Sequence, residues 1–238
     1  MPTTLMAQID AAIGGKVGVD FLGTKNWIGS FWHPAWVYVC TELLSTLARA
    51  EIASGFAELV KVGAIVGNPL WSEIEKHISR DALPGSIGAK PVTLGIEAKL
   101  NLLAGDPMEM ASLDRALNFG HCIGHAVEAA SGFRFRHGEA VAIGMAVASR
   151  LGEYRGNVDT DFRGDLERWL EAYQLPTEIP ETLITDSWKR IDDLRRVRNG
   201  SLRMATVRRP GDIHFVDDIG EAEFVNASRQ ASVRIQAI

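Results

Sequence analysis

The chain has few of the sequence features that mark disulfide-rich, nucleic-acid-binding or membrane proteins. Its 238 residues contain only two cysteines, Cys40 and Cys122, which are too few for a disulfide framework and indicate a reducing cytoplasmic location. The net charge of -5 comes from interspersed acids and bases without a basic run or acidic tail, so no nucleic-acid partner is expected. The longest apolar stretch, residues 140–148, is less than half a membrane span, and the first residues do not resemble a signal peptide. We therefore expect no membrane partner.

Helical patterning dominates the chain after its first 46 residues. The composition, with 46% hydrophobic and 23% charged residues, is ordinary for a globular protein with a sizeable core. Apolar periodicity predicts a series of helices over residues 48–66, 70–79, 91–104, 114–131, 138–154, 160–173 and 181–197. Residues 202–207 and 213–216 flank an Arg-Pro-Gly-Asp turn and predict a small hairpin.

The first 46 residues have a different character. They predict a short helix over 5–13, a glycine-containing loop over 16–30 and a buried strand over 36–40. A single buried strand cannot satisfy its own backbone groups, so its sheet partners are expected in another chain or in a missing part of the protein. We expect a mainly α protein: residues 1–46 are a short α/β remnant with a ligand loop, and residues 47–238 a helical domain with a late hairpin.

Three of the six histidines lie within seventeen residues. His121 and His125 are four apart on a predicted helix and share a face, and His137 precedes the next helix. Neutral imidazoles so spaced are common zinc ligands. Two histidines four apart on a helix also arise by chance, so the spacing alone leaves both a metal site and an ordinary helix face open.

Two further clusters carry charge in unusual surroundings. Glu58 and Lys61 share one face of an otherwise apolar helix, which indicates either an intrahelical ion pair or a ligand site. The segment 14–26 combines glycines with Lys16, Lys25 and Asn26, a set of donors suited to an anionic or phosphorylated ligand. Its spacing matches neither a Walker A loop nor a dinucleotide fingerprint, and a plain surface loop remains the alternative.

Taken together, these segments resemble one known family. PTTL and AQID, GGKVGV, KN, SGFAELVK, NFGH with GHAVE, and HGEAVA occur in one order over residues 2–142 at matching spacings. They resemble the 3-dehydroquinate synthase family of sugar-phosphate cyclases, and the match runs from Pro2 to about Gly200. Members combine an N-terminal NAD-binding domain with a helical metal-binding domain, and most of the former is expected to be missing here.

The resemblance implies a role for each matched residue. A divalent zinc or cobalt ion would be held by Glu58, His121 and His137. Catalysis would involve His125, Lys16 and Glu109. Substrate contacts would come from Asp10, Lys16, Asn26, Lys61, Lys99, Asn118, Arg115 and Arg195. NAD would be contacted by Thr3, Thr4, Lys25 and Thr46.

The implied reaction is redox-neutral. It converts 3-deoxy-D-arabino-heptulosonate 7-phosphate to 3-dehydroquinate and phosphate by transient oxidation with NAD, phosphate elimination and intramolecular aldol closure, and family members are commonly homodimers. The alternatives are a cyclitol synthase acting on sedoheptulose 7-phosphate or another sugar phosphate, an inactive metal-binding fragment, and more remotely a metal-dependent alcohol dehydrogenase. Asp114 stands where the family usually has an arginine, as in relatives that accept sedoheptulose 7-phosphate, whereas His125 and the His-Gly-Glu at 137–139 favour the dehydroquinate type.

Overall fold

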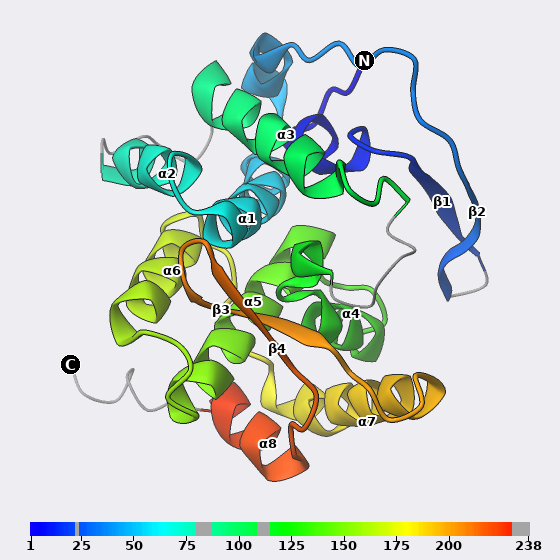
Figure 1. Cartoon of the computed structure of the whole chain (residues 1–238), viewed down its shortest axis with the longest axis vertical. Coiled ribbons are helices and arrows are strands. Elements are labelled where there is room, and N and C mark those ends of the chain that lie inside the picture. Colours follow the sequence, from blue (N-terminus) through cyan, green and yellow to red (C-terminus); the bar gives the residue numbers. More distant parts are fainter. Residues whose placement is uncertain (22–23, 80–86, 109–114, 230–238) are drawn as a thin grey trace.

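The computed structural model describes residues 1–21, 24–79, 87–108 and 115–229, without the side chains of residues 20, 24–27 and 79. The elements follow one another along the chain as η1 (Ala7–Ala11), β1 (Lys16–Phe21), β2 (Thr24–Phe31), η2 (Thr41–Thr46), α1 (Arg49–Val66), α2 (Leu70–Ser79), α3 (Ala89–Leu103), η3 (Ala116–Asn118), α4 (His121–Ala130), α5 (His137–Tyr154), α6 (Thr160–Ala172), α7 (Glu181–Val197), β3 (Met204–Arg209), β4 (Asp212–Val216) and α8 (Glu221–Arg229). Helices make up most of the body (Figure 1). The expected fold class, mainly α with a short N-terminal remnant and a late hairpin, is confirmed.

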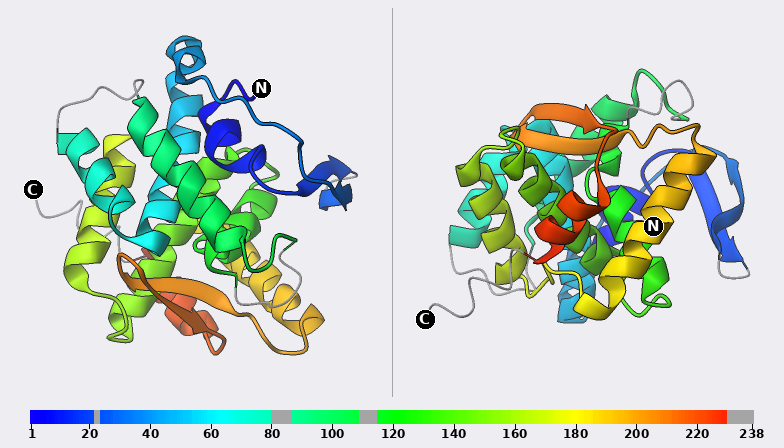
Figure 2. Two further views of the ribbon diagram at one scale, coloured as in Figure 1. Left: turned by 45° about the horizontal axis from the view of Figure 1, so that its top comes forward. Right: turned by 90° about the horizontal axis from the view of Figure 1, so that it is seen from below.

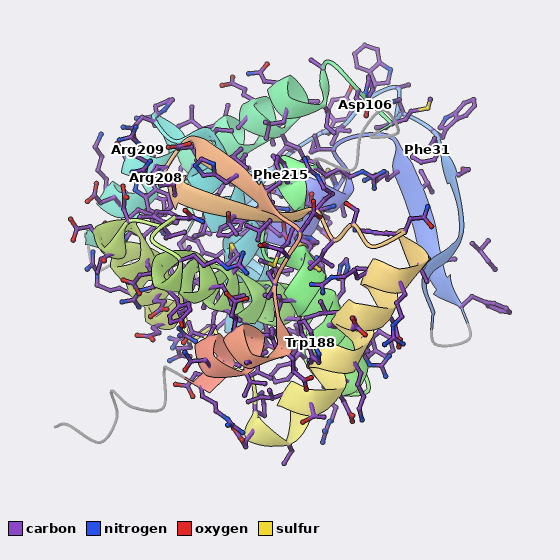
Figure 3. The ribbon with its side chains drawn as sticks, turned by 60° about the horizontal axis from the view of Figure 1, so that its bottom comes forward. Phe31, Asp106, Trp188, Arg208, Arg209 and Phe215 are labelled. Carbon is purple, nitrogen blue, oxygen red and sulfur yellow. The ribbon has the colours of Figure 1, made fainter. Side chains whose placement is uncertain are left out.

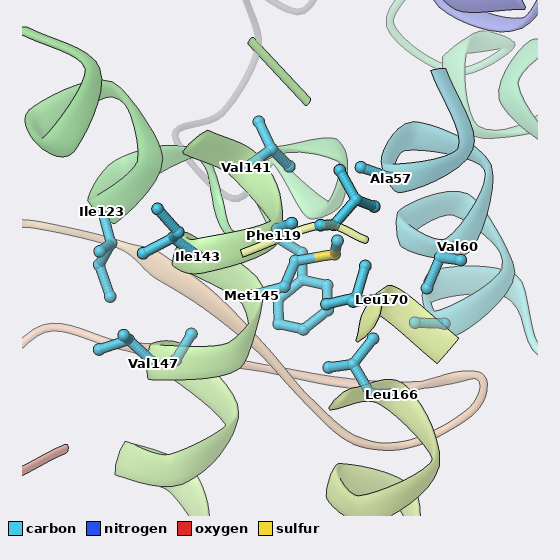
Figure 4. Packing of buried hydrophobic residues seen from close by; sticks show 14 of the residues in the cluster. Ala57, Val60, Phe119, Ile123, Val141, Ile143, Met145, Val147, Leu166 and Leu170 are labelled. Atoms are coloured by element: carbon cyan, nitrogen blue, oxygen red, sulfur yellow. The ribbon is translucent and has the colours of Figure 1, made fainter. Parts of the chain in front are cut away.

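Two helices form the centre of the body. α5 is buried from Ala140 to Gly152 and α1 from Ile52 to Ile65, as expected for helices that are apolar on nearly every face. α4, α6, α8 and β3 pack around α5, while α2 and α3 pack on α1. Figure 4 shows the resulting contact, where Ala57 and Val60 of α1 face Met145 of α5 and Leu170 of α6.

The hairpin of β3 and β4 covers one side of this core (Figure 2). Its strands pair antiparallel from Met204 opposite Val216 to Arg209 opposite Asp212. The buried face of β3 packs on α5, and Figure 3 shows Arg208 and Arg209 at the turn end, away from that core. At the turn, the Gly211 N–H donates to the Ala64 carbonyl at 2.9 Å, which ties the hairpin to the end of α1.

The N-terminal segment, residues 1–46, differs from the sequence prediction in two ways. The segment 16–30 was expected as a loop, but its described residues, 16–21 and 24–30, belong to β1 and β2, because Val17, Val19 and Phe21 alternate along a strand paired with β2. The buried strand expected over residues 36–40 is wrong: this segment has no strand structure, and Trp36 and Tyr38 are 80% and 69% exposed. Apolar, β-prone residues form a buried strand only with a neighbouring strand, and none in the described part of the chain pairs with them.

One predicted helix is also wrong in its extent. Residues 114–131 were expected to be continuous, but α4 begins at His121, and the preceding Gly120 adopts a positive φ of 77°. A short 3-10 turn, η3, lies upstream of this break. Among the described residues, no helix is long and apolar enough to cross a membrane.

Candidate active site

Glycines bring α4 and α5 unusually close together. A Cβ on Gly124 would lie 2.7 Å from the Ala140 carbonyl oxygen, and one on Gly144 would collide with the carbonyl of Gly120. Real side chains do not tolerate such approaches, so both positions depend on the missing Cβ. As a result, the first two turns of α4, which carry His121 and His125, face the start of α5, where His137 is the first residue.

A second close contact ties α5 to α1. The Gly138 N–H donates to the buried Ser54 Oγ at 3.0 Å, and any side chain at Gly138 would collide with the Ser54 backbone. Glu58 lies one helical turn after Ser54, so the contact brings His137 next to the Glu58 carboxylate. A second link between these helices lies nearer the solvent, where the guanidinium of Arg136, just before α5, pairs with Glu51 of α1 at 2.9 Å.

The carboxylate and the imidazoles form a compact cluster. Glu58 Oε1 lies 3.6 Å from His121 Nε2 and 3.4 Å from His137 Nε2. His125 belongs to the same group, since one nitrogen of each of the three imidazoles lies within 4.8 Å of the others. His125 is the exposed member, whereas Glu58 is fully buried.

Lys61 balances the charge of Glu58. Its Nζ lies 2.5 Å from Glu58 Oε2, and both side chains are almost completely buried. Burial alone would raise the pKa of Glu58, but the Lys61 ammonium, followed by the neighbouring imidazoles of His121 and His137, outweighs it and holds that pKa well below the usual value of 4.5. The carboxylate is therefore ionised at neutral pH, and the intrahelical ion pair, one of the two alternatives that the spacing left open, is present.

His121 is held neutral by the same surroundings. Its burial, followed by the positive charge of Lys61, lowers its pKa well below 6.5. The His121 Nδ1 lies 3.3 Å from the Phe119 carbonyl oxygen, so a proton on Nδ1 leaves the Nε2 lone pair directed toward Glu58. Neutral imidazole with an available lone pair is the form that binds metal ions.

The cluster fits a divalent metal ion. Lys61 contacts Oε2 of Glu58, whereas the buried Oε1 accepts no hydrogen bond within the described part of the chain, and a cation bound at Oε1 would offset that cost. Zinc binds nitrogen and oxygen ligands at about 2.0–2.2 Å, so ligands of a tetrahedral centre lie roughly 3.3–3.6 Å apart. The separations of 3.4 and 3.6 Å from Oε1 match this spacing.

A cavity of about 800 Å³ opens in front of the cluster. It gathers most of the residues singled out in the sequence: Asp10, Lys16, Lys61, Lys99, Arg115, Asn118, His121, His125 and His137. They come from η1, β1, α1, α3, the segment before α4, α4 and α5, so seven separate stretches of the chain converge on the cavity. Gly14 and Gly15 also line the cavity, so backbone of the predicted ligand loop is exposed to it.

Two residues with expected substrate roles pair with each other. The Lys99 Nζ donates to the Asp10 backbone oxygen at 2.6 Å and to Asp10 Oδ1 at 2.5 Å. Lys99 is only 8% exposed, so this contact fixes η1 against α3 at the edge of the cavity. A ligand carboxylate could approach Lys99 only beside an existing carboxylate.

Other predicted residues lie elsewhere. Arg195 donates to the Ile219 carbonyl at 2.6 Å and does not line the cavity. Thr4 accepts the Ala7 N–H at 3.1 Å and caps η1, Thr3 is exposed, and Thr46 donates to the Leu43 carbonyl. None of these threonines lines the cavity. The side chains of Lys25 and Asn26, and residues Glu109 and Asp114, lie outside the described part.

Several residues shape the site without lining the cavity, and the sequence alone assigned them no role. Ser54 and the glycines of α4 and α5 were quoted as motif letters, but their close contacts depend on tertiary packing. Glu128, whose carboxylate lies 3.8 Å from His137 Nδ1, was likewise quoted only as a motif letter, without a role. Its position, seven residues after His121 on the same helix, was the available signal.

Two family models match the chain in succession. The model described as 3-dehydroquinate synthase N-terminal matches residues 1–54, and the one described as 3-dehydroquinate synthase C-terminal matches residues 55–195. The chain is 39% identical over 233 residues to a 2-epi-valiolone synthase of Stigmatella aurantiaca, covering 93% of this chain. It is 37% identical over 234 residues to a 3-dehydroquinate synthase of Geobacter metallireducens, covering 92% of this chain.

Solved structures show the same fold. A 2-epi-5-epi-valiolone synthase from Streptomyces hygroscopicus, with NAD+ and Zn2+ bound, superposes with a TM-score of 0.88 at 30% identity over 98% of this chain. A 2-deoxy-scyllo-inosose synthase, complexed with carbaglucose-6-phosphate, NAD+ and Co2+, gives 0.81 over 97% of this chain; at 22% identity it supports the fold alone.

All of these proteins are longer than this chain. It spans 57% of the Stigmatella relative, 63% of the Geobacter relative, and 65% and 66% of the two solved chains. The consecutive matches over residues 1–195 nevertheless cover both parts of one family in order. The chain belongs to the 3-dehydroquinate synthase family.

Proposed function

We propose that this chain carries the metal and substrate sites of an enzyme that converts 3-deoxy-D-arabino-heptulosonate 7-phosphate to 3-dehydroquinate and phosphate, a step in aromatic amino acid biosynthesis. The observation that supports this most is the cavity itself. It joins a metal-type cluster of Glu58, His121 and His137 to the cationic side chains of Lys16 and Lys99. An acidic sugar phosphate needs both features.

The proposed cofactors are NAD and a divalent zinc or cobalt ion. Glu58, His121 and His137 would hold the ion, which when bound polarises a substrate hydroxyl and lowers its pKa. NAD would supply a reversible hydride acceptor for the substrate. A relative that is 30% identical was solved with NAD+ and Zn2+, which favours the same pair for this chain.

The chain's own residues would position the substrate and move protons. His125 is the exposed imidazole of the cluster, so it is the one that a substrate reaches and the one best suited to proton transfer. Lys61 keeps Glu58 ionised, and Lys16 at the start of β1 offers an ammonium to the substrate from the opposite wall. Holding the reacting groups in one orientation is itself a large share of such catalysis.

A second candidate is cyclisation of sedoheptulose 7-phosphate, favoured by the 39% identity to the 2-epi-valiolone synthase. The two substrates differ in charge, because only the heptulosonate has a carboxylate. Lys99 would bind that carboxylate in the first reaction, and its contact with Asp10 is the feature that such a substrate must rearrange or share.

Phosphate release by the full-length enzyme containing this chain, with NAD and zinc, separates the candidates. We expect turnover of the heptulosonate and a strong loss in Lys99→Met. The matched control is Lys90→Met, whose ammonium is 68% exposed and pairs with Glu73, and which should keep full activity. Turnover of sedoheptulose 7-phosphate alone would establish the second candidate instead. Zinc binding without NAD binding by calorimetry would indicate an inactive metal-binding protein.

Full-length enzyme is also expected to form a homodimer, as family members commonly do. Sedimentation velocity at micromolar concentration measures this directly. A monomer that turns over substrate would contradict this part of the proposal and leave the chemistry standing.

A further inference from the structure

Glu128 is a buried carboxylate to which the proposed reaction gives no role, yet it lies beside a proposed metal ligand. It sits on α4 seven residues after His121 and three after His125, so all three side chains share one face. Glu128 is 5% exposed. Its Oε2 lies 3.8 Å from Nδ1 of His137, while Nε2 of the same ring lies 3.4 Å from Glu58 Oε1. The imidazole of His137 is therefore bracketed by two carboxylates.

We propose that Glu128 is a positioning residue that holds His137 in the tautomer and orientation required for metal binding. A neutral imidazole carries one N–H, and a carboxylate beside Nδ1 favours the proton there. The lone pair then lies on Nε2, the nitrogen that faces Glu58 and the cluster. This inference rests on the proposed function, since it assumes that His137 binds an ion through Nε2.

The backbone around Glu128 fixes its position relative to His137. The Glu128 carbonyl accepts the Ser131 hydroxyl at 2.8 Å and the Phe133 N–H at 2.9 Å, which closes the end of α4. The start of α5 is fixed in turn by the Gly138 N–H, which donates to Ser54. With both ends held, the gap of 3.8 Å closes to hydrogen-bond length by a side-chain shift of about 1 Å.

The burial of Glu128 also favours this role. An ionised carboxylate that is removed from water is costly unless donors or cations surround it. Placing it next to a histidine that binds a cation through its other nitrogen lowers that cost, and the cation raises the acidity of the Nδ1 proton. Carboxylates behind metal-bound histidines act in this way and typically change metal affinity by about 10–100-fold.

Metal affinity, rather than activity, tests the proposal. Purified protein would be stripped of metal, and its affinity for Zn2+ and Co2+ measured by competition with a chromophoric chelator, together with the Co2+ absorption spectrum. The variants are Glu128→Ala and Glu128→Gln. The matched control is Glu167→Gln, a carboxylate on α6 with a side chain only 13% exposed, which contacts Arg150 and Arg163 outside the cluster.

We expect Glu128→Ala to bind both ions about 10–100-fold more weakly, with a changed Co2+ spectrum. Glu128→Gln should fall between Glu128→Ala and the parent, because an amide oxygen still accepts a hydrogen bond without the charge. Glu167→Gln should keep the parent affinity even if it lowers thermal stability. Circular dichroism tests whether each variant is folded. If Glu128→Ala is unfolded, the metal affinity of Glu128→Gln alone decides whether Glu128 positions His137.

Two further variants keep this proposal separate from the proposed function. Glu58→Gln and His121→Ala remove proposed ligands, and both should abolish measurable binding. If these two bind like the parent, the metal site itself is misassigned. If they lose binding while the Glu128 variants keep the parent affinity and spectrum, the role of Glu128 is overturned and the metal site stands. If the Glu128 variants lose no more metal affinity than Glu167→Gln does, Glu128 has only a structural role and the proposal is overturned.

Discussion

The buried ion pair of Glu58 and Lys61 gives the sharpest test of the site's electrostatics. Replacing Lys61 by Met removes the ammonium 2.5 Å from the carboxylate and keeps a side chain of similar length. Glu58 is fully buried and Lys61 is 2% exposed, so the remaining charge cannot reach water. Breaking a buried pair in this way costs about 3–5 kcal/mol. For a chain of this size, that corresponds to a fall of roughly 6–20 °C in Tm.

The assay is thermal and urea unfolding of metal-free protein, with Lys90→Met as the matched control. Lys90 also pairs with a glutamate, at 2.8 Å, but it is 68% exposed, so its loss should cost less than about 1 kcal/mol. The double variant Glu58→Gln with Lys61→Met should recover much of the stability, because it leaves no buried charge. Equal Tm values for Lys61→Met and the parent without metal would refute the reasoning.

The pH dependence supplies an independent readout. In the parent, the pKa of Glu58 is held well below 4.5, so this group stabilises the fold above pH 4.5 and the contribution is lost as pH falls through the folded pKa. In Lys61→Met, burial, already the largest influence on this pKa, meets less opposition and moves it upward. The destabilisation caused by Lys61→Met should therefore shrink between pH 7 and pH 5. A constant difference across that range would contradict the assignment of the effect to Glu58.

Three further predictions concern packing, charge and metal. Gly124→Ala should lower stability by about 1–3 kcal/mol, measured by urea unfolding, because its Cβ would lie 2.7 Å from the Ala140 carbonyl oxygen. Arg150→Met should cost about 1–3 kcal/mol in the same assay, because the Thr177 carbonyl loses its donor and Glu167 keeps only Arg163, at 3.0 Å, as a cationic partner. Removing zinc with a chelator should lower Tm. If the ion had been present at 100 times its Kd, the free energy of unfolding should fall by about 2.7 kcal/mol, and an unchanged Tm would argue against a bound ion.

The sequence predicts the strongly periodic helices well. The expected ranges 48–66, 70–79 and 160–173 differ from α1, α2 and α6 by no more than one residue at either end. These segments have an apolar stripe or an apolar surface all round, together with clear ends, and both signals are local. The shared face of Glu58 and Lys61 is likewise a local consequence of helical geometry, and the ion pair that this spacing allowed is present.

The sequence fails where tertiary contacts decide the conformation. Gly120 ends one turn and begins α4 with a positive φ of 77°, a break that does not interrupt the apolar period of residues 114–131. The glycines of residues 16–30 conceal the alternation of Val17 and Val19 that builds β1. Trp36 is apolar enough for a buried strand, yet it is 80% exposed because burial requires a neighbouring surface that local sequence does not encode.

The same distinction explains the site. The spacing of His121 and His125 identifies a helix face, but it does not reveal that Glu58, sixty-three residues upstream, lies 3.6 Å from His121. That meeting depends on two backbone contacts, Gly138 with Ser54 and Gly144 with Gly120, which exclude every side chain larger than hydrogen. The polar residues proposed to act in the reaction are therefore held in place by glycines, which have no side chain to react. Changes at these glycines should abolish metal binding as surely as changes at the ligands, while leaving every ligand in the sequence.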